Sequence, residues 1–196
     1  MTQADKFWDW FLGNREIVEQ LFVSDPPAAV RMIEKPFRAA APRLVFETSP
    51  HAKRKEFVVS ADGYAERFEE VIAFTKAAPE IPGWKVIAFR QPDNLAGADY
   101  KGAHLDRKNV FVEADLSPEG FVDLILYLPY TPGTNSGDIE GASILLLDSC
   151  LGEYVAAKRI RHVDFVDIAR KPNVALPLDS LRNYFSDNEA LIKDFK

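Results

Sequence analysis

Apolar residues near the start of the chain recur every three or four positions, which is the spacing of an amphipathic helix. Within residues 4–22 this stripe consists of Phe7, Trp8, Phe11, Val18, Leu21 and Phe22. Residues 24–27 then combine a capping candidate with two prolines, a pattern typical of the start of another helix. We expect its core face to consist of Val30, Ile33 and Phe37. Pro36 should kink or restart this helix, and Gly13 is the weak point of the first one.

Beyond Pro42 the pattern changes to short runs rich in β-branched and aromatic residues, as in strands. We expect strands at residues 44–47, 56–61, 84–89, 110–113, 121–128 and 160–168. Helical spacing at residues 64–77 and 139–151, the latter closed by Gly152, places a helix inside each of two β-α-β outlines. A short helix around residues 178–185 ends the chain. The pattern therefore predicts an α+β fold with a mixed β-sheet of about five to seven strands, β-α-β units and an N-terminal helical pair.

The run at residues 121–128 is apolar at both alternating sets of positions except Asp123, which indicates a central strand covered on two sides. Asp123 itself is either near solvent at the start of the strand or a buried, paired carboxylate. No fixed-period repeat, low-complexity tract or linker-like change in composition divides the 196 residues. We therefore expect a single domain, in which a helical segment, residues 1–41, packs on an α+β body, residues 42–196.

Composition narrows the class of protein. A hydrophobic share of 47% with 28% charged residues is typical of a folded globular chain. The single cysteine, Cys150, excludes an internal disulfide and favours the cytoplasm. The N-terminus lacks the features of a signal peptide, and no apolar run is long enough for a membrane span. A net charge of −6 opposes binding to nucleic acid. We expect no nucleic acid or membrane partner, whereas a protein partner or self-association stays open.

Common cofactor signatures are missing from the sequence. It contains neither the glycine-rich phosphate and dinucleotide motifs nor a GxSxG nucleophile elbow. The three histidines, His51, His104 and His162, lack metal-ligand spacing. Cys150 lies among leucines and is more consistent with a small buried hydrophobe than with a nucleophile. The basic clusters at residues 53–55 and 158–161 are typical of solvated turns and strand edges. We expect no cofactor and no metal.

The best candidate site lies where two predicted strands end. If the strands at 56–61 and 84–89 are parallel neighbours, Asp62 and Arg90 meet at one sheet edge, where open α/β sheets place ligands. Tyr130 and the loop at 131–138 would join them if the strand at 121–128 runs the same way. The alternative is that Asp62 belongs to a helix-starting turn and Arg90 to a strand exit.

Further candidates flank the predicted helix at 139–151. Asp148 interrupts its leucine run, and Glu153 follows its C-terminus, where a negative charge opposes the helix dipole. The nearby basic run at residues 158–161 indicates an ion-pair network, with a catalytic acid/base pair as the alternative. His162 completes the list of candidate binding residues.

Three stretches resemble a group of small uncharacterised bacterial proteins. They are Phe7–Phe11 (FWDWF), Lys55–Pro92 and Leu145–Tyr154 (LLLDSCLGEY). The resemblance implies an intact domain of bacterial, cytosolic origin. It implies no activity, cofactor or catalytic residue.

Two classes of function remain after these exclusions. A non-catalytic binding or regulatory protein is favoured, because no catalytic constellation stands out. The alternative is a small hydrolase-like enzyme with a carboxylate-lined cleft assembled from the candidates above. An enzyme needs a pocket with convergent polar groups, whereas a binding protein needs an exposed surface or sheet edge. Whether the protein is an enzyme stays open.

Overall fold

The computed structural model describes residues 1–50 and 55–194. The chain folds into two compact units, Met1–Arg90 and Gln91–Lys196, and the single domain expected above stays a prediction. The α+β class, the N-terminal helical pair and the β-α-β units are confirmed. The described strands are divided among three sheets. His51, Lys53 and Arg54 lie outside the described residues.

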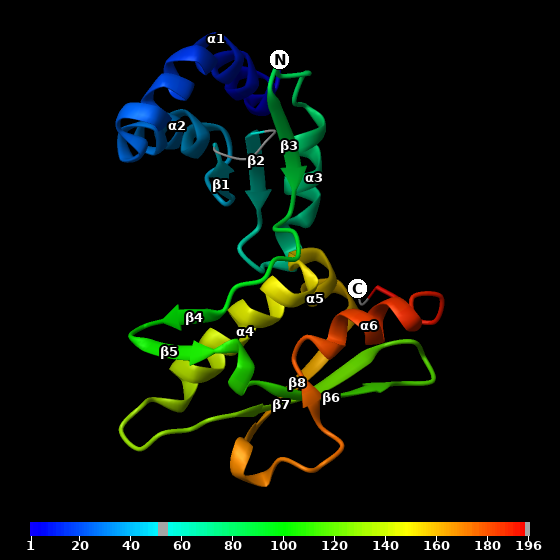
Figure 1. The fold of residues 1–196 in the computed structure, drawn as a ribbon. Helices are drawn as coiled ribbons and strands as arrows, with labels where there is room; N and C mark the ends of the chain where they lie inside the picture. The colour runs from blue at the N-terminus through cyan, green and yellow to red at the C-terminus, as the bar shows by residue number, and fades with distance from the viewer. Residues whose placement is uncertain (51–54, 195–196) are drawn as a thin grey trace. The chain divides into compact units, whose positions relative to one another are not determined.

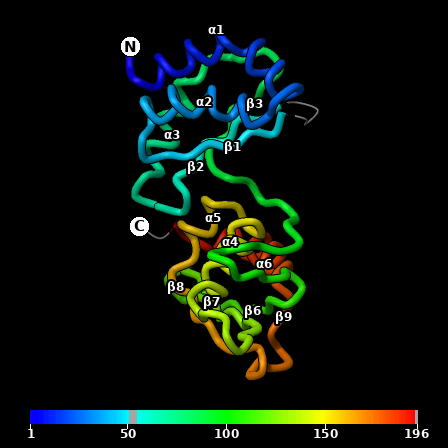
Figure 2. The backbone as a smooth tube through the Cα atoms, turned by 90° about the vertical axis from the view of Figure 1, so that its left-hand side faces the viewer, coloured from blue at the N-terminus to red at the C-terminus, as the bar shows by residue number. Residues whose placement is uncertain are grey.

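The helical pair consists of α1 (Gln3–Ser24) and α2 (Pro26–Ala40), which lie side by side (Figures 1 and 2). The helix α2 continues through Pro36 and does not restart there. Its buried stripe is Ala29, Ile33 and Phe37. Val30, which we expected in the core, is 41% exposed. The i, i+4, i+8 spacing of the buried residues turns Val30 toward the side of the stripe.

The sheet of the first unit has the order β1 (Val45–Ser49), β2 (Lys55–Ser60), β3 (Trp84–Ala88). The strand β1 is antiparallel to β2, and β2 is parallel to β3. A short 3₁₀ helix, η1 (Ala65–Arg67), and the helix α3 (Phe68–Lys76) connect the parallel pair. This is the first predicted β-α-β unit.

Aromatic rings fill the core of the first unit. The rings in contact include Phe7, Trp8, Phe11, Phe37, Phe57 and Phe74. Trp8 and Phe11 of α1 are fully buried, and their ring centroids lie 5.3 and 5.2 Å from that of Phe57 on β2. The indole Nε1 of Trp8 donates to the carbonyl of Phe74 at 2.8 Å, so its polar atom is satisfied although it is buried. The aromatic stripe of α1 is therefore core packing.

The second unit contains two sheets. Its strands are β4 (Gly97–Tyr100), β5 (Ala103–Asp106), β6 (Phe111–Leu116), β7 (Val122–Leu128), β8 (Ile160–Asp167) and β9 (Leu176–Pro177). Its helices are η2 (Arg107–Asn109), α4 (Ser136–Leu151), α5 (Glu153–Arg159), η3 (Ile168–Arg170) and α6 (Ser180–Asp187). The larger sheet has the order β8-β7-β6-β9, in which β7 is parallel to β8 and antiparallel to β6. The strand β7 has a neighbour on each side, so the prediction that the strand at residues 121–128 is central is confirmed.

The helices α4 and α6 lie on one side of this sheet (Figure 1). Leu124 and Leu126 of β7 are almost fully buried in the core of this unit. Because side chains alternate along a strand, Asp123, Ile125 and Tyr127 point to the opposite face. Asp123 and Ile125 are only half-buried, so the prediction of covering on both sides is wrong for the first half of β7. None of the helices in residues 1–50 and 55–194 combines the length and apolar character needed to cross a membrane.

Candidate functional site

The face of the β8-β7-β6-β9 sheet opposite the helices carries a hollow of about 370 Å³. The side chains of its outward positions are Glu113, Asp115, Asp123, Ile125, His162 and Asp164. We call these six residues the acidic face. Four of them are carboxylates, and one, Ile125, supplies an apolar centre.

The strand register arranges the acidic face in two rows across β6, β7 and β8. The first row is Asp115, Asp123 and His162, and the second is Glu113, Ile125 and Asp164. Directly opposed residues in adjacent strands bring their Cβ atoms to about 5 Å. Asp115 and Asp123 are therefore like charges placed opposite one another, an arrangement that destabilises a sheet unless a cation compensates it.

Arg161 compensates one carboxylate of the acidic face. A β-bulge between β7 and β8 inserts Arg161 beside Asp123, which also keeps His162 as its register partner. The guanidinium binds both carboxylate oxygens of Asp123, with Nε 2.9 Å from Oδ1 and Nη2 in contact with Oδ2. This hydrogen bonding holds the pKa of Asp123 below its usual value. Asp123 is thus a paired carboxylate whose side chain remains 31% exposed.

The acidic face continues into an apolar end. The third row across the strands is Phe111, Tyr127 and Val166. The hydroxyl of Tyr127 donates to Glu113 Oε1, and this bond, with a smaller contribution from burial, raises the pKa of Tyr127 to about 12. A neutral phenol therefore holds Glu113 in a fixed orientation at the border between the two ends.

His162 lies on β8, the edge strand that borders the acidic face. Its Nε2 is 3.0 Å from Asp164 Oδ1, and the two side chains are 62% and 63% exposed. In the part of the chain that the structure describes, no group of three or more His, Cys, Asp or Glu residues is arranged to hold a metal ion. The carboxylates are spread over three strands, which suits an extended cationic surface better than a single ion.

Asp62 and Arg90 meet as the sequence predicted. They follow the parallel strands β2 and β3, and Arg90 Nη2 donates to Asp62 Oδ1 at 3.1 Å. Arg90 Nε also donates to Glu47 Oε1 at 2.5 Å, so β1 contributes a second carboxylate to this edge. Asp62 adopts a φ of 56° before Gly63, as expected of a turn that leads into a helix.

Tyr130 follows β7, which belongs to a different sheet from β2 and β3. The expectation that one sheet edge gathers Tyr130 with Asp62 and Arg90 is therefore wrong. The Tyr130 hydroxyl donates to Glu140 Oε1 at 3.1 Å. Burial and this hydrogen bond raise the pKa of Tyr130 to about 12, so the phenol acts as a donor that holds the start of α4.

Asp148 and Glu153 flank the junction of α4 and α5. Asp148 is half-buried in the last turn of α4, and Glu153 begins α5 fully buried. Gly152 between them has a φ of 83° and caps α4, as predicted. From the basic run, Arg159 binds Glu189 and Asp194, each at 3.2 Å.

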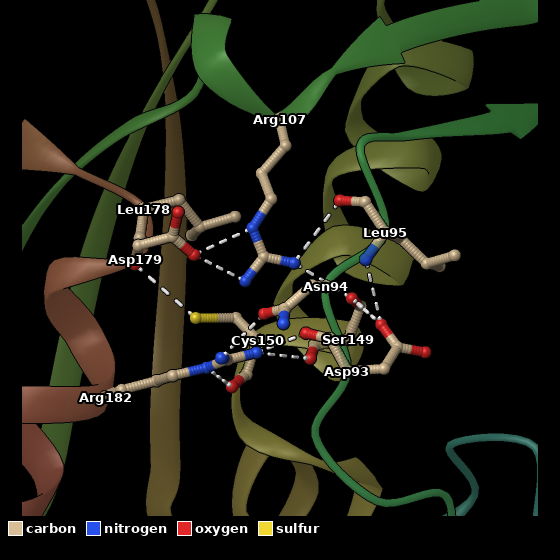
Figure 3. Close-up of polar contacts among 9 residues, drawn as sticks. All are labelled: Asp93, Asn94, Leu95, Arg107, Ser149, Cys150, Leu178, Asp179 and Arg182. Carbon is tan, nitrogen blue, oxygen red and sulfur yellow. Dashed lines mark hydrogen bonds and ion pairs between the residues drawn. The ribbon is translucent and has the colours of Figure 1, made fainter.

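A buried polar network near this junction was missed in the sequence (Figure 3). Arg107 is 8% exposed, and its Nε and Nη2 lie 2.8 and 2.6 Å from Asp179 Oδ1. Its Nη1 donates to Ser149 Oγ at 2.9 Å, and the Ser149 hydroxyl donates to Asp93. Arg107 gave no signal because it lies between Asp106 and Lys108 in a short polar run typical of an exposed turn, and Ser149 gave none because it follows Asp148 near the end of a helix.

Arg182 of α6 completes this network through two backbone carbonyls and the side chain of Asn94. Its Nε donates to the carbonyl of Cys150 at 2.8 Å, Nη1 to Asn94 Oδ1 at 2.9 Å, and Nη2 to the carbonyl of Asp93 (Figure 3). The Cys150 thiol is fully buried, lies 3.5 Å from the carbonyl of Leu178, and has its pKa raised by burial. These contacts fasten α4, α6 and residues 93–95 together, so the network is structural and the thiol is a core residue.

Comparison of the chain with protein-family models, with curated proteins and with solved structures finds no match.

Proposed function

We propose that this is a non-catalytic binding protein whose acidic face binds a cationic segment of a partner protein. The observation that carries the proposal is the set of four carboxylates around Ile125 on the sheet face opposite α4 and α6. A sheet face that serves only to meet water needs no opposed aspartates, because such pairs weaken the sheet. Arg161 offsets part of that cost through Asp123, and a cationic partner offsets the remainder at Asp115.

The negative charge of the acidic face determines which kind of partner it attracts. Arg161 is held by Asp123, whereas Asp115 is exposed and Asp164 is paired only with the exposed His162 among the described residues. The acidic face therefore presents an excess of negative charge, which attracts lysine and arginine and repels polyphosphate. At the apolar end, the half-buried Phe111 and Val166 add surface for aliphatic side chains of the partner, whereas Tyr127 is buried.

We propose the bacterial cytoplasm as the place where the protein works. The single cysteine supports a reducing compartment. The resemblance of Lys55–Pro92 and Leu145–Tyr154 to bacterial sequences supports the origin. The net charge of −6 supports a partner other than nucleic acid.

A designed peptide tests the binding function. We expect a short peptide of alternating lysine and valine to bind the full-length protein in a calorimetric titration, and a peptide of alternating glutamate and valine not to bind. The double variant Asp115→Lys/Asp164→Lys should weaken binding about tenfold or more. The control variant Asp187→Lys reverses an exposed charge outside the acidic face, and it should change affinity by less than about twofold. Added salt should weaken binding.

Two results would count against the proposal. A loss of binding free energy in Asp187→Lys about half as large as in the double variant would show that only net charge attracts the peptide, because one charge reversal is compared with two. Cleavage of the lysine–valine peptide during the titration, abolished in the double variant, would replace the binding function with the hydrolase that the sequence also allows.

A further inference from the structure

A groove of about 500 Å³ lies in the first unit, between α2 and β1. Its walls consist of Val30, Glu34, Phe37, Arg38, Pro42, Arg43, Leu44, Val45, Phe46 and Arg67. We call it the arginine groove. It combines an apolar wall with three guanidinium groups, and its volume is within the usual range for sites of small ligands.

Two of the three arginines already have carboxylate partners. Arg38 Nη2 lies 2.7 Å from Glu34 Oε1, four residues earlier on α2. Arg43 forms an ion pair with Glu70 of α3. No carboxylate among the described residues lies within ion-pair distance of Arg67. Arg67 therefore supplies the positive charge of the groove that the protein leaves uncompensated.

Arg67 is also held in a fixed position. Its Nη1 donates to the carbonyl of Arg43 at 3.0 Å, and its Cζ lies 3.9 Å from the ring centroid of Tyr64. Its Nε is shielded from solvent and has no hydrogen-bond partner within residues 1–50 and 55–194. Because solvent does not reach Nε, an anion in the groove would pair with the outer nitrogens of the guanidinium, a group that is already oriented.

Ring packing forms the apolar wall of the arginine groove. Phe46 is half-buried and stacks on Phe57, with ring centroids 5.3 Å apart and an interplanar angle of 15°. It also contacts Phe37 at 4.9 Å between centroids. Val30 is 41% exposed, although it was expected in the core. A preformed apolar wall binds an aliphatic chain without first ordering its own side chains.

We propose that the arginine groove binds a small linear carboxylic acid, with the carboxylate on Arg67 and the aliphatic chain along Val30 and Phe46. One fixed cation next to an apolar wall is complementary to one anion attached to an apolar chain. This site is in the first unit and is independent of the acidic face proposed above.

Octanoate is the probe, and octanamide is its uncharged counterpart of the same length. In titrations of the full-length protein followed by amide NMR, octanoate should shift the resonances of residues in the arginine groove saturably, and octanamide should not. Arg67→Met keeps the aliphatic stem and removes the charge, so it should weaken octanoate binding about tenfold or more. Arg31→Met is the control, because Arg31 is an exposed arginine of the same helix that is paired with Asp25 and does not line the groove; the affinity of this variant for octanoate should stay within about twofold of the wild type.

A second variant keeps the test decisive if Arg67→Met does not fold. Val30→Asp places a carboxylate on the exposed apolar wall, where it should abolish octanoate binding and leave the thermal unfolding midpoint nearly unchanged. The proposal is overturned if octanoate causes no saturable shift, if octanamide binds equally well, or if Val30→Asp or Arg67→Met binds like the wild type.

Discussion

At the residue scale, neighbouring strands determine the exposure and the ion pairing of Asp123. Its place in an apolar strand left two interpretations open, near solvent or buried and paired. The structure combines them, because the bulge in β8 brings Arg161 onto a carboxylate that is still partly exposed. The pattern of β7 could not show this partner, which lies 38 residues later in the chain.

The pairing of Asp123 with Arg161 predicts a pH dependence of stability. Because Arg161 lowers the pKa of Asp123 from 3.8, the ion pair stabilises the fold above the unfolded-state pKa and loses this effect as pH falls through the folded-state pKa. We expect Asp123→Asn to lower the free energy of unfolding by up to about 1 kcal/mol at pH 7, since the pair is partly exposed. In urea titrations at a series of pH values, the difference from the wild type should vanish below the lowered pKa.

Arg161→Gln provides the control for this prediction. In that background, Asp123→Asn should no longer change the pH dependence of unfolding. If the difference in free energy of unfolding between the wild type and Asp123→Asn stays constant from neutral to acidic pH, protonation of Asp123 is not linked to folding.

At the element scale, two glycines inside helices have opposite surroundings. A Cβ added at Gly13 of α1 meets no atom within 4 Å. A Cβ added at Gly141 of α4 would lie 2.4 Å from Cδ1 and 3.0 Å from Cγ of Tyr100. The glycine of α4 therefore allows the β4-β5 hairpin to pack closely against this helix, whereas Gly13 only weakens its own helix, as the sequence indicated.

Alanine substitutions should separate these two roles. Gly13→Ala should raise the free energy of unfolding by about 0.5 to 1 kcal/mol, because alanine costs less backbone entropy in a helix. Gly141→Ala should lower it by about 1 to 3 kcal/mol through overpacking against Tyr100. Chemical denaturation of both variants measures the difference, and a stabilising Gly141→Ala would contradict the close packing.

Elements with a strong local signal were predictable. The stripes of α1 and α2, the caps of the helices and the two β-α-β outlines all depend on residues close in sequence. The β4-β5 hairpin was missed because its turn places Lys101 at a φ of 47°, followed by Gly102 at 89°. Asparagine or aspartate is the usual residue at that first position. Because lysine stands there instead, the sequence lacks the usual signal of a hairpin turn.

At the scale of the whole molecule, each unit has its own core, and all three tryptophans, Trp8, Trp10 and Trp84, belong to the first. Tryptophan fluorescence therefore reports on Met1–Arg90, whereas far-ultraviolet circular dichroism reports on both units. We expect Leu126→Ala to destabilise the second unit by about 2 to 5 kcal/mol. Part of the dichroism transition should move to lower denaturant, and the fluorescence transition should stay in place. An equal shift in both signals would instead support the single cooperative domain that the sequence favoured.

The sequence by itself determined the α+β class, the helical pair and the two β-α-β units, because hydrophobic periodicity and capping act over a few neighbouring residues. Tertiary structure decided which strands share a sheet, and so separated Tyr130 from Asp62 and Arg90. It also aligned Asp115 with Asp123 through strand register and left Arg67 without an ion-pair partner among the described residues. These outcomes depend on pairings between distant segments, whose energies are set by the packing of a whole unit rather than by any local pattern.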